Sequence, residues 1–396
     1  MANVSSSNGL EKRPALSFRD DCGREFPSWH RTTLGTIIEP YSEKVHGEHD
    51  FEVLTSSREG LQRQIDHFGS QQRHDTDGYN IIPLGFCTYR NRSDDGRFTF
   101  NINKISDKAI VSKFYPVFRF KNANSTFMTE YLNSSARARK KLSVLAVGTS
   151  QVVLSFEALK SAKFDLPCKE EQDKIASLLE CLNERVELQR SFVDALKKYK
   201  RGLLSNLFGE KITQGCTTKS YYFSEIAQRR SEKYDPTSGI EYPCVELENI
   251  EQETGKILST VPSTAQSSIK NIAKYGDTLF GKLRPYLRKY AFAQKTMACS
   301  SEIWALIPSD AVLPKFLFYL VQTEQFLRVA NISSGTKMPR AEWSNIEKTE
   351  FFIPDPFVQR KVVSLLEGLD QKITFADSAL FSLNRLKASL MQQLFI

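Results

Sequence analysis

The sequence predicts an α+β protein: two mixed α/β domains separated by two long antiparallel coiled-coil helices, related by a pseudo-twofold internal repeat. Two observations lead to this fold class. The first is a duplication without gaps, in which the segment 164–167 (Phe-Asp-Leu-Pro) aligns with 351–354 (Phe-Phe-Ile-Pro) at an offset of 187 residues. The second is the length of 396 residues, which is too great for one ordinary domain.

The duplication continues into a predicted helix in each copy. At the same offset, Gln172 aligns with Gln359 and Lys200 with Lys387, and no gap is needed over about 45 residues. Such a run of matches rarely arises by chance, so we interpret the two segments as copies of one unit.

Apolar residues recur in both copies at alternating spacings of four and three, which is typical of a coiled-coil seam. Each predicted helix covers roughly 38 residues, or about 55–60 Å. The simplest partner for each seam is the other copy; a dimerisation tail that pairs with a second chain is the alternative. The predicted seam comprises Ile175, Leu179, Leu182, Val186, Leu196 and Leu203 in the first copy, and Val362, Leu366, Leu369, Ile373, Leu383 and Leu390 in the second.

The copies divide the chain into alternating segments. Shorter similarities precede the helices, such as Gly148-Thr149 with Gly335-Thr336. The helices are more alike than the segments before them, as expected for a common frame that carries domains of different specificity. The predicted segments are an N-terminal tail (1–17), a first domain (18–165), a central helix (166–208), a second domain (209–352) and a C-terminal helix (353–396).

Both domains mix short apolar runs with helical stretches, separated by glycine and polar turns. An amphipathic helix is predicted over 315–327. The predicted strands are 81–86, 98–102 and 115–120 in the first domain, and 278–280, 290–293 and 303–307 in the second.

Basic residues concentrate in the second domain. The formal net charge of the chain is +8, and seven basic residues and one acidic residue lie between Lys270 and Lys295. Cations interleaved with tyrosines suit a nucleic acid, because Lys and Arg neutralise phosphates and Arg binds guanine. The predicted DNA contacts of the second domain are Lys282, Arg284, Tyr286, Arg288, Lys289, Tyr290, Arg229, Arg230, Lys337 and Arg340.

The first domain has a weaker basic cluster, around residues 88–97. A solvated basic face with core tyrosines is the alternative interpretation for both clusters. Arg137, Arg139, Lys140 and Lys141 are further candidates. The predicted DNA contacts of the first domain are Arg58, Arg63, Tyr89, Arg90, Arg92 and Arg97.

The seven cysteines are scattered, and none forms a CxxC pair, which is typical of a reducing compartment. The first residues lack an apolar signal core, and no segment approaches the length of a membrane span. We therefore expect a cytoplasmic protein that does not associate with membranes.

The motif aromatic-x-(Leu/Ile)-Pro-x-x-x-x-Gln, continuing into a long helix, resembles the repeated region of type I restriction-modification specificity subunits. The segment Gly276-Asp277…Gly281-Lys-Leu-Arg284 resembles part of their target-recognition domains. The likeness extends over nearly the whole chain. The helix motif is fairly specific because it occurs twice, whereas each recognition segment is weak by itself.

The resemblance implies a subunit without catalytic residues that reads a bipartite site in double-stranded DNA. It implies two methyltransferase subunits as partners, which carry S-adenosylmethionine, and it allows two restriction/translocase subunits, which use ATP and Mg²⁺. No cofactor or metal is expected in this chain itself. We find no phosphate-binding glycine loop, no HExxH and no paired CxxC.

Two other classes of function remain open. A coiled-coil DNA-binding scaffold or regulator would work without methyltransferase partners. It gives no reason for two diverged domains on duplicated helices, because dimeric DNA readers usually duplicate by the symmetry of two chains. An unrecognised enzyme, such as a nuclease, would need a cluster of acidic and basic catalytic residues, and the sequence shows none.

Overall fold

The computed structural model describes residues 14–69, 75–209, 217–332 and 337–395. Most of the predicted N-terminal tail and the Gly335-Thr336 pair lie outside these ranges. The chain forms two compact units, unit 1 (Met1–Gln189 and Ala379–Ile396) and unit 2 (Arg190–Ser378). Each unit combines one α+β domain with parts of both long helices.

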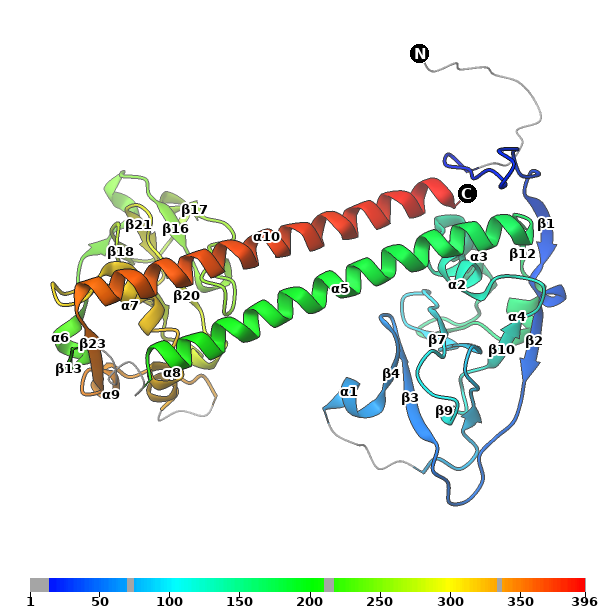
Figure 1. Cartoon of the computed structure of the whole chain (residues 1–396), viewed down its shortest axis with the longest axis horizontal. Coiled ribbons are helices and arrows are strands. Elements are labelled where there is room, and N and C mark those ends of the chain that lie inside the picture. Colours follow the sequence, from blue (N-terminus) through cyan, green and yellow to red (C-terminus); the bar gives the residue numbers. More distant parts are fainter. Residues whose placement is uncertain (1–13, 70–74, 210–216, 333–336, 396) are drawn as a thin grey trace, which may run out of the picture. The chain divides into compact units, whose positions relative to one another are not determined.

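The two predicted long helices are present and have equal lengths. They are α5 (Lys169–Leu207) and α10 (Pro356–Leu394), each of 39 residues and without interruption (Figure 1). Asp355 caps α10, because its side chain accepts hydrogen bonds from the amides of Phe357 and Val358. At 1.5 Å per residue, each helix is about 58 Å long.

Most of the predicted seam is buried, and the remainder is half-buried. Eight of the twelve seam residues, including Ile175 and Leu366, are buried. Leu196, Leu203, Leu383 and Leu390 are only half-buried. A straight helix drifts by about 20° per heptad from a strict seven-residue repeat. By the last turns the buried positions have moved on, to Leu204 in α5 and to Met391 and Leu394 in α10.

Each unit has a core that includes the start of one long helix and the end of the other. In unit 1, Ile175 and Leu179 of α5 pack with Leu394 and Phe395 against the domain. In unit 2, Val362 and Leu366 of α10 share a core with Leu204 of α5. The seams therefore pack against the domains as well as against the other helix.

Two ion pairs in unit 2 show that the helices run antiparallel there. Lys200 Nζ lies 2.7 Å from Asp370 Oδ1, and Lys197 Nζ lies 3.4 Å from Asp377 Oδ1. The residue number rises along one helix as it falls along the other.

Unit 1 contains two four-stranded sheets, with orders β2-β10-β6-β8 and β4-β3-β9-β5, and two strand pairs, β1-β12 and β7-β11. The strands are β1 (His30–Thr33), β2 (Ile38–Tyr41), β3 (Glu52–Ser57), β4 (Gly60–Arg63), β5 (Asn80–Ile81), β6 (Cys87–Tyr89), β7 (Arg92–Ser93), β8 (Phe100–Ile102), β9 (Ala109–Val111), β10 (Val117–Phe120), β11 (Val152–Val153) and β12 (Lys163–Leu166). The shorter helices are η1 (Leu34–Thr36), α1 (Gln64–Phe68), α2 (Ser125–Ser134), α3 (Ala136–Leu145) and α4 (Phe156–Ser161).

Unit 2 contains a four-stranded sheet of order β14-β22-β19-β20, a five-stranded sheet of order β15-β18-β21-β16-β17, and the pair β13-β23. The strands are β13 (Thr218–Tyr222), β14 (Ala227–Arg229), β15 (Lys233–Tyr234), β16 (Pro243–Val245), β17 (Val261–Pro262), β18 (Lys270–Ala273), β19 (Thr278–Gly281), β20 (Tyr290–Phe292), β21 (Met297–Cys299), β22 (Ile303–Pro308) and β23 (Glu350–Pro354). The shorter helices are α6 (Phe223–Ile226), η3 (Pro236–Ser238), η4 (Leu247–Asn249), η5 (Ser263–Ala265), η6 (Pro285–Leu287), α7 (Pro314–Leu320), α8 (Glu324–Ala330) and α9 (Trp343–Ile346).

Two predicted elements differ from the structure. The helix predicted over 315–327 is two helices, α7 and α8, because the Thr323 side chain caps a new start at α8. Of the strand predicted over 81–86, only Ile81 belongs to a strand, β5. Pro83 lacks an amide hydrogen, and Gly85 has a φ of 81°, so the chain turns before β6.

The same glutamine joins each domain to its long helix. In unit 1, Gln172 Oε1 accepts from the Asn124 amide (2.9 Å), and Gln172 Nε2 donates to the Pro167 carbonyl (2.9 Å). In unit 2, Gln359 Oε1 accepts from the Leu313 amide (2.8 Å), and Gln359 Nε2 donates to the Pro354 and Ala311 carbonyls (2.9 Å each). Both glutamines are buried, so these bonds fix the helix starts.

Across the described ranges, no helix combines the length and apolarity that a membrane crossing requires.

Candidate nucleic-acid interface

The loop between β19 and β20 places two predicted contacts at the surface of unit 2. Arg284 and Arg288 flank η6 in left-handed backbone conformations, with φ values of 50° and 49°. The Arg284 amide donates to the Pro339 carbonyl (2.7 Å), and Pro285 between them is buried, so the loop is fixed. Left-handed backbone costs about 1 kcal/mol or more per non-glycine residue, and such strain concentrates at functional sites.

Arg284 is the cation of this loop that is most available to a ligand. Its side chain is exposed and forms no ion pair or hydrogen bond with any residue of the described ranges. Tyr286, two residues later, is 54% exposed. An unpaired guanidinium beside an exposed phenol suits contacts to phosphates and base edges.

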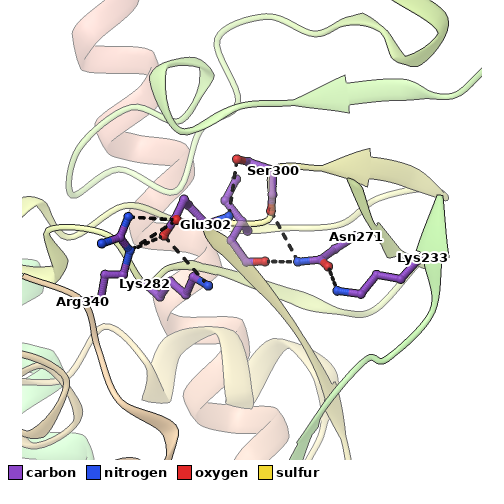
Figure 2. A network of polar contacts seen from close by, with 7 residues as sticks. Lys233, Asn271, Lys282, Ser300, Glu302 and Arg340 are labelled. Carbon is purple, nitrogen blue, oxygen red and sulfur yellow. Dashed lines mark hydrogen bonds and ion pairs between the residues drawn. The ribbon is translucent and has the colours of Figure 1, made fainter. Parts of the chain in front are cut away.

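A carboxylate holds two other predicted contacts, Lys282 and Arg340 (Figure 2). Arg340 Nε lies 3.0 Å from Glu302 Oε2, and Arg340 Nη2 lies 3.2 Å from Oε1. Lys282 Nζ lies 3.9 Å from Glu302 Oε2. The bond to Glu302 raises the pKa of the Arg340 guanidinium. Glu302 therefore neutralises part of the charge at this loop and orients both cations.

The turn that carries Glu302 is braced from the neighbouring sheet (Figure 2). Asn271 Nδ2 donates to the Ile303 carbonyl (2.8 Å), and Lys233 Nζ donates to Asn271 Oδ1 (2.5 Å). The Lys282 amide donates to the Glu302 carbonyl (2.9 Å). Glu302 is thus a rigid part of the loop cluster that the sequence did not single out.

Several other predicted contacts of unit 2 are occupied by structural interactions. Arg288 Nη1 lies 2.8 Å from Glu324 Oε1, and Lys289 Nζ donates to the Leu247 carbonyl (2.6 Å). Arg230 forms a bidentate pair with the buried carboxylate of Asp277, with distances of 2.6 and 2.8 Å, which raises the pKa of Arg230. Arg230 therefore braces the Gly276-Asp277 segment.

The structure corrects the prediction for two tyrosines. Tyr290 is buried in unit 2, where its hydroxyl donates to the Glu253 carbonyl (2.8 Å) and burial raises its pKa. Tyr89 is fully buried in unit 1, where its hydroxyl donates to the Leu154 carbonyl (3.0 Å). Each belongs to a strand whose register points it into the core, so neither side chain offers a surface to DNA.

Arg229 and Lys337 remain exposed in unit 2. The Arg229 guanidinium carbon lies 4.8 Å from the centroid of the Trp343 ring, which is within the range of a cation–π contact. Lys337 is exposed at the start of the segment that runs along the Arg284 loop.

The predicted cations of unit 1 are exposed but spread over several elements. Arg58 Nη2 lies 2.6 Å from Asp95 Oδ2, and Arg63 Nε lies 2.6 Å from Glu52 Oε1. Hydrogen bonds from Ser93, from the Arg97 amide and from Arg58 hold the pKa of Asp95 at about 2. The Arg92 guanidinium carbon lies 5.0 Å from the Phe114 ring centroid, and Arg90 and Arg97 are exposed.

The fold and these loops define a class of protein: two repeats, each an α+β domain with a long helix, that present cations on fixed loops. The chain matches the family described as "Type I restriction modification DNA specificity domain" twice, over residues 49–197 and 223–379. These matches cover more than half of the chain, so the protein belongs to this family.

Known proteins agree with this membership. The specificity subunit of the type I restriction enzyme HindI from Haemophilus influenzae is 26% identical over 198 residues, which is 45% of this chain and 40% of that protein. The matched stretch thus spans less than half of that relative.

The architecture is also found in solved structures. The S subunit of a type I restriction-modification system from M. genitalium matches with a TM-score of 0.57 at 16% identity, covering 97% of this chain and 99% of that one. A chain from a study of complex assembly and conformational transition of the type I R-M system matches with a TM-score of 0.54 at 16% identity, covering 94% and 98%. At this identity the likeness establishes the fold.

Proposed function

We propose that this chain is the non-catalytic specificity subunit of a type I restriction-modification complex, which acts in the cytoplasm. Each domain reads one half of a bipartite site in double-stranded DNA, and the long helices set the spacing between the halves. One observation supports this proposal most: a fixed, strained loop holds Arg284 and Tyr286 at the surface, and neither has a carboxylate partner among the residues that the structure describes. Direct readout of bases is favoured when a rigid backbone presents the reading side chains.

The helices also offer surfaces for two copies of one partner. Exposed apolar residues lie outside the seams at equivalent positions of the repeat. Leu188 is 63% exposed and its counterpart Phe375 is 80% exposed, and Tyr199 and Leu386 are 62% and 48% exposed. We propose that these positions dock two methyltransferase subunits, which supply S-adenosylmethionine. Restriction subunits that use ATP and Mg²⁺ join a complex that also cleaves DNA.

The proposal is tested by expressing the chain with the methyltransferase subunit encoded beside its gene and mapping modified adenines across the host genome. We expect a split motif, with two defined halves around an undefined spacer. New methylation at an undivided motif would overturn the bipartite reading. A stable complex that gives no new methylation would favour a scaffold or regulator.

A domain exchange tests the modular organisation. We propose residues 18–165 and 209–352 as the two recognition domains. Replacing 209–352 by the corresponding domain of a related subunit should change one half of the methylated motif and leave the other half intact. A change in both halves would contradict the proposed boundaries.

A further inference from the structure

Unit 1 contains a polar cleft of 560 Å³ where the domain meets the long helices. Its walls come from β4 and β8, from α2 and α3, and from one residue of each long helix, Asn183 and Lys387. Five cations line it, against two carboxylates, Glu59 and Glu130. The cations are Arg58, Arg97, Lys104, Arg139 and Lys387.

Three of these cations have no counter-ion within the described ranges. Arg58 pairs with Asp95, and Lys104 Nζ lies 3.9 Å from Glu180 Oε1. The side chains of Arg97, Arg139 and Lys387 form no ion pair with any residue in the described part of the chain. Glu130 forms no ion pair with these three cations; its carboxylate accepts a hydrogen bond from Asn183 Nδ2 (3.2 Å).

The corresponding cavity of unit 2 has a volume of 640 Å³, and the cations that line it are neutralised by carboxylates of the same unit. Lys200, the repeat counterpart of Lys387, is buried and lies 2.7 Å from Asp370, the counterpart of Asn183. The other cations that line this cavity also have carboxylate partners; Lys315 with Glu367 and Lys256 with Asp377 are examples. Unit 1 keeps the lysine but replaces the aspartate by an amide.

The chemistry of the cleft points to a phosphodiester chain as its ligand. Unpaired Lys and Arg side chains bind phosphate oxygens well, Lys as a point charge and Arg as a fork. Here they come from three separate segments that line one polar cleft, namely the turn before β8, α3 and α10. Arg97 and Arg139 are exposed, whereas Lys387, on α10, is half-buried. Several such groups from separate parts of one cleft match successive phosphates better than they match one small anion.

We infer that this cleft binds backbone phosphates of DNA through Arg97, Arg139 and Lys387, so that the helix frame itself contacts DNA at unit 1. The inference rests on the proposed function and adds residues to it. Phosphate contacts position a protein on DNA without reading sequence. Lys387 thus sets the register of the helix frame on the duplex, a role distinct from that of the base-reading loops.

The test is a salt titration of DNA binding by the full chain in complex with its methyltransferase subunit, using a duplex that carries the mapped site and one with a scrambled site. Each of Lys387→Ala and Arg139→Ala should reduce the slope of log K against log salt by about one unit on both duplexes. Between 50 and 200 mM salt this is roughly a three- to fourfold smaller loss of affinity. Lys387→Arg should restore the slope.

Lys372→Ala is the matched control, because Lys372 is an exposed cation of α10 that does not line the cleft. It should leave the slope within error of the parent, and the thermal midpoints of all variants should agree. Unchanged slopes in both cleft variants would overturn the inference. Inorganic phosphate that stabilises the parent but not Lys387→Ala, with unchanged slopes, would also overturn it in favour of a free phosphate. If the parent complex binds no DNA, the proposed function fails instead.

Discussion

The two units place the same lysine of the repeat in opposite situations. In unit 2, Lys200 is buried and pairs with Asp370, which also accepts a hydrogen bond from the Tyr319 hydroxyl (2.9 Å). In unit 1, Lys387 faces a cleft beside Asn183 and has no ion pair among the described residues. The lysine is thus ion-paired in one copy and has no ion pair among the described residues in the other, and the equivalent position on the facing helix is a carboxylate in the first case and an amide in the second.

The glutamine joints show the opposite behaviour. Gln172 and Gln359 occupy equivalent positions and are both buried. Each side chain accepts a hydrogen bond from a backbone amide of the domain and donates one to a backbone carbonyl. The repeat therefore preserves the glutamine joints between domain and helix, whereas the charges that face the two cavities differ.

Replacing the joints should have the largest effect on stability. Gln359→Leu removes three hydrogen bonds and leaves the Leu313 amide unpaired, so we expect a loss of about 3 kcal/mol in the free energy of unfolding. Gln172→Leu removes two hydrogen bonds and should cost about 2 kcal/mol. Urea unfolding followed by circular dichroism measures both.

The exposed Gln392 provides the control for this pair, and Gln392→Leu should change the unfolding free energy by less than about 0.5 kcal/mol. Equal losses in all three variants would show that the joints contribute nothing beyond an ordinary surface glutamine.

Substitutions at Asp370 and Asn183 test whether these two residues determine the different states of Lys200 and Lys387. Asp370→Asn gives unit 2 the arrangement of unit 1 and leaves the buried Lys200 ammonium without a carboxylate, so we expect a loss of about 2 kcal/mol in unfolding free energy. Asn183→Asp gives Lys387 a carboxylate and should reduce the salt slope of DNA binding. If Asp370→Asn left the unfolding free energy unchanged and Asn183→Asp left the salt slope unchanged, these two residues would not determine the states of the lysines.

Arg284→Ala tests the base-reading loop of unit 2. We expect a loss of about 1–2 kcal/mol in binding free energy, with relaxed specificity in only one half of the site. Competition assays with duplexes mutated in one half at a time measure this. Lys348→Ala, at another exposed lysine of the same unit, should leave both halves unaffected. Relaxed specificity in both halves of the site would contradict the assignment of this loop to a single half-site.

Alkaline pH should destabilise both units, by a smaller amount. Burial raises the pKa of Tyr131 in unit 1 to about 12, and burial together with Asp370 raises that of Tyr319 in unit 2. The folded state keeps these phenolic protons while the unfolded chain loses them above its pKa of about 10. The contribution of these two phenols to stability is therefore level below pH 10 and falls as the pH rises through the window above it, by at most about 1.4 kcal/mol per pH unit for each tyrosine.

Tyr319→Phe should make this decline shallower in urea midpoints between pH 8 and 11. Tyr275→Phe, at a phenol that is 75% exposed, should leave it as in the parent. Identical declines in the parent and in Tyr319→Phe would remove Tyr319 as a cause.

The frame was predictable from the sequence because it depends on local periodicity. The helix lengths and most of the seam follow from the repeat, and the family follows from the Gln motif. The outcome for Lys200 and Lys387 was not predictable in the same way. Both interrupt the seam with a lysine, and what separates them is a partner about 170 to 200 positions away in the sequence.

The burial of individual tyrosines within the basic clusters could not be predicted from the sequence either. Tyr286 and Tyr290 both lie among Lys and Arg residues, yet only Tyr286 is exposed. Tyr290 begins β20, where it pairs opposite Phe280, so strand register directs its ring into the core. Register depends on a neighbouring strand, which local composition does not reveal.

The core of unit 1 depends on the last turn of α10, and this has a consequence for how the chain folds during synthesis. Met391, Leu394 and Phe395 share a core with residues of the first domain, and the Phe395 ring packs against that of Phe127. Unit 2 is one continuous stretch, Arg190–Ser378. Domains generally fold in the order in which the ribosome makes them. Here the later unit can complete its core first, while the earlier one waits with apolar surface exposed until residue 395 has left the ribosome.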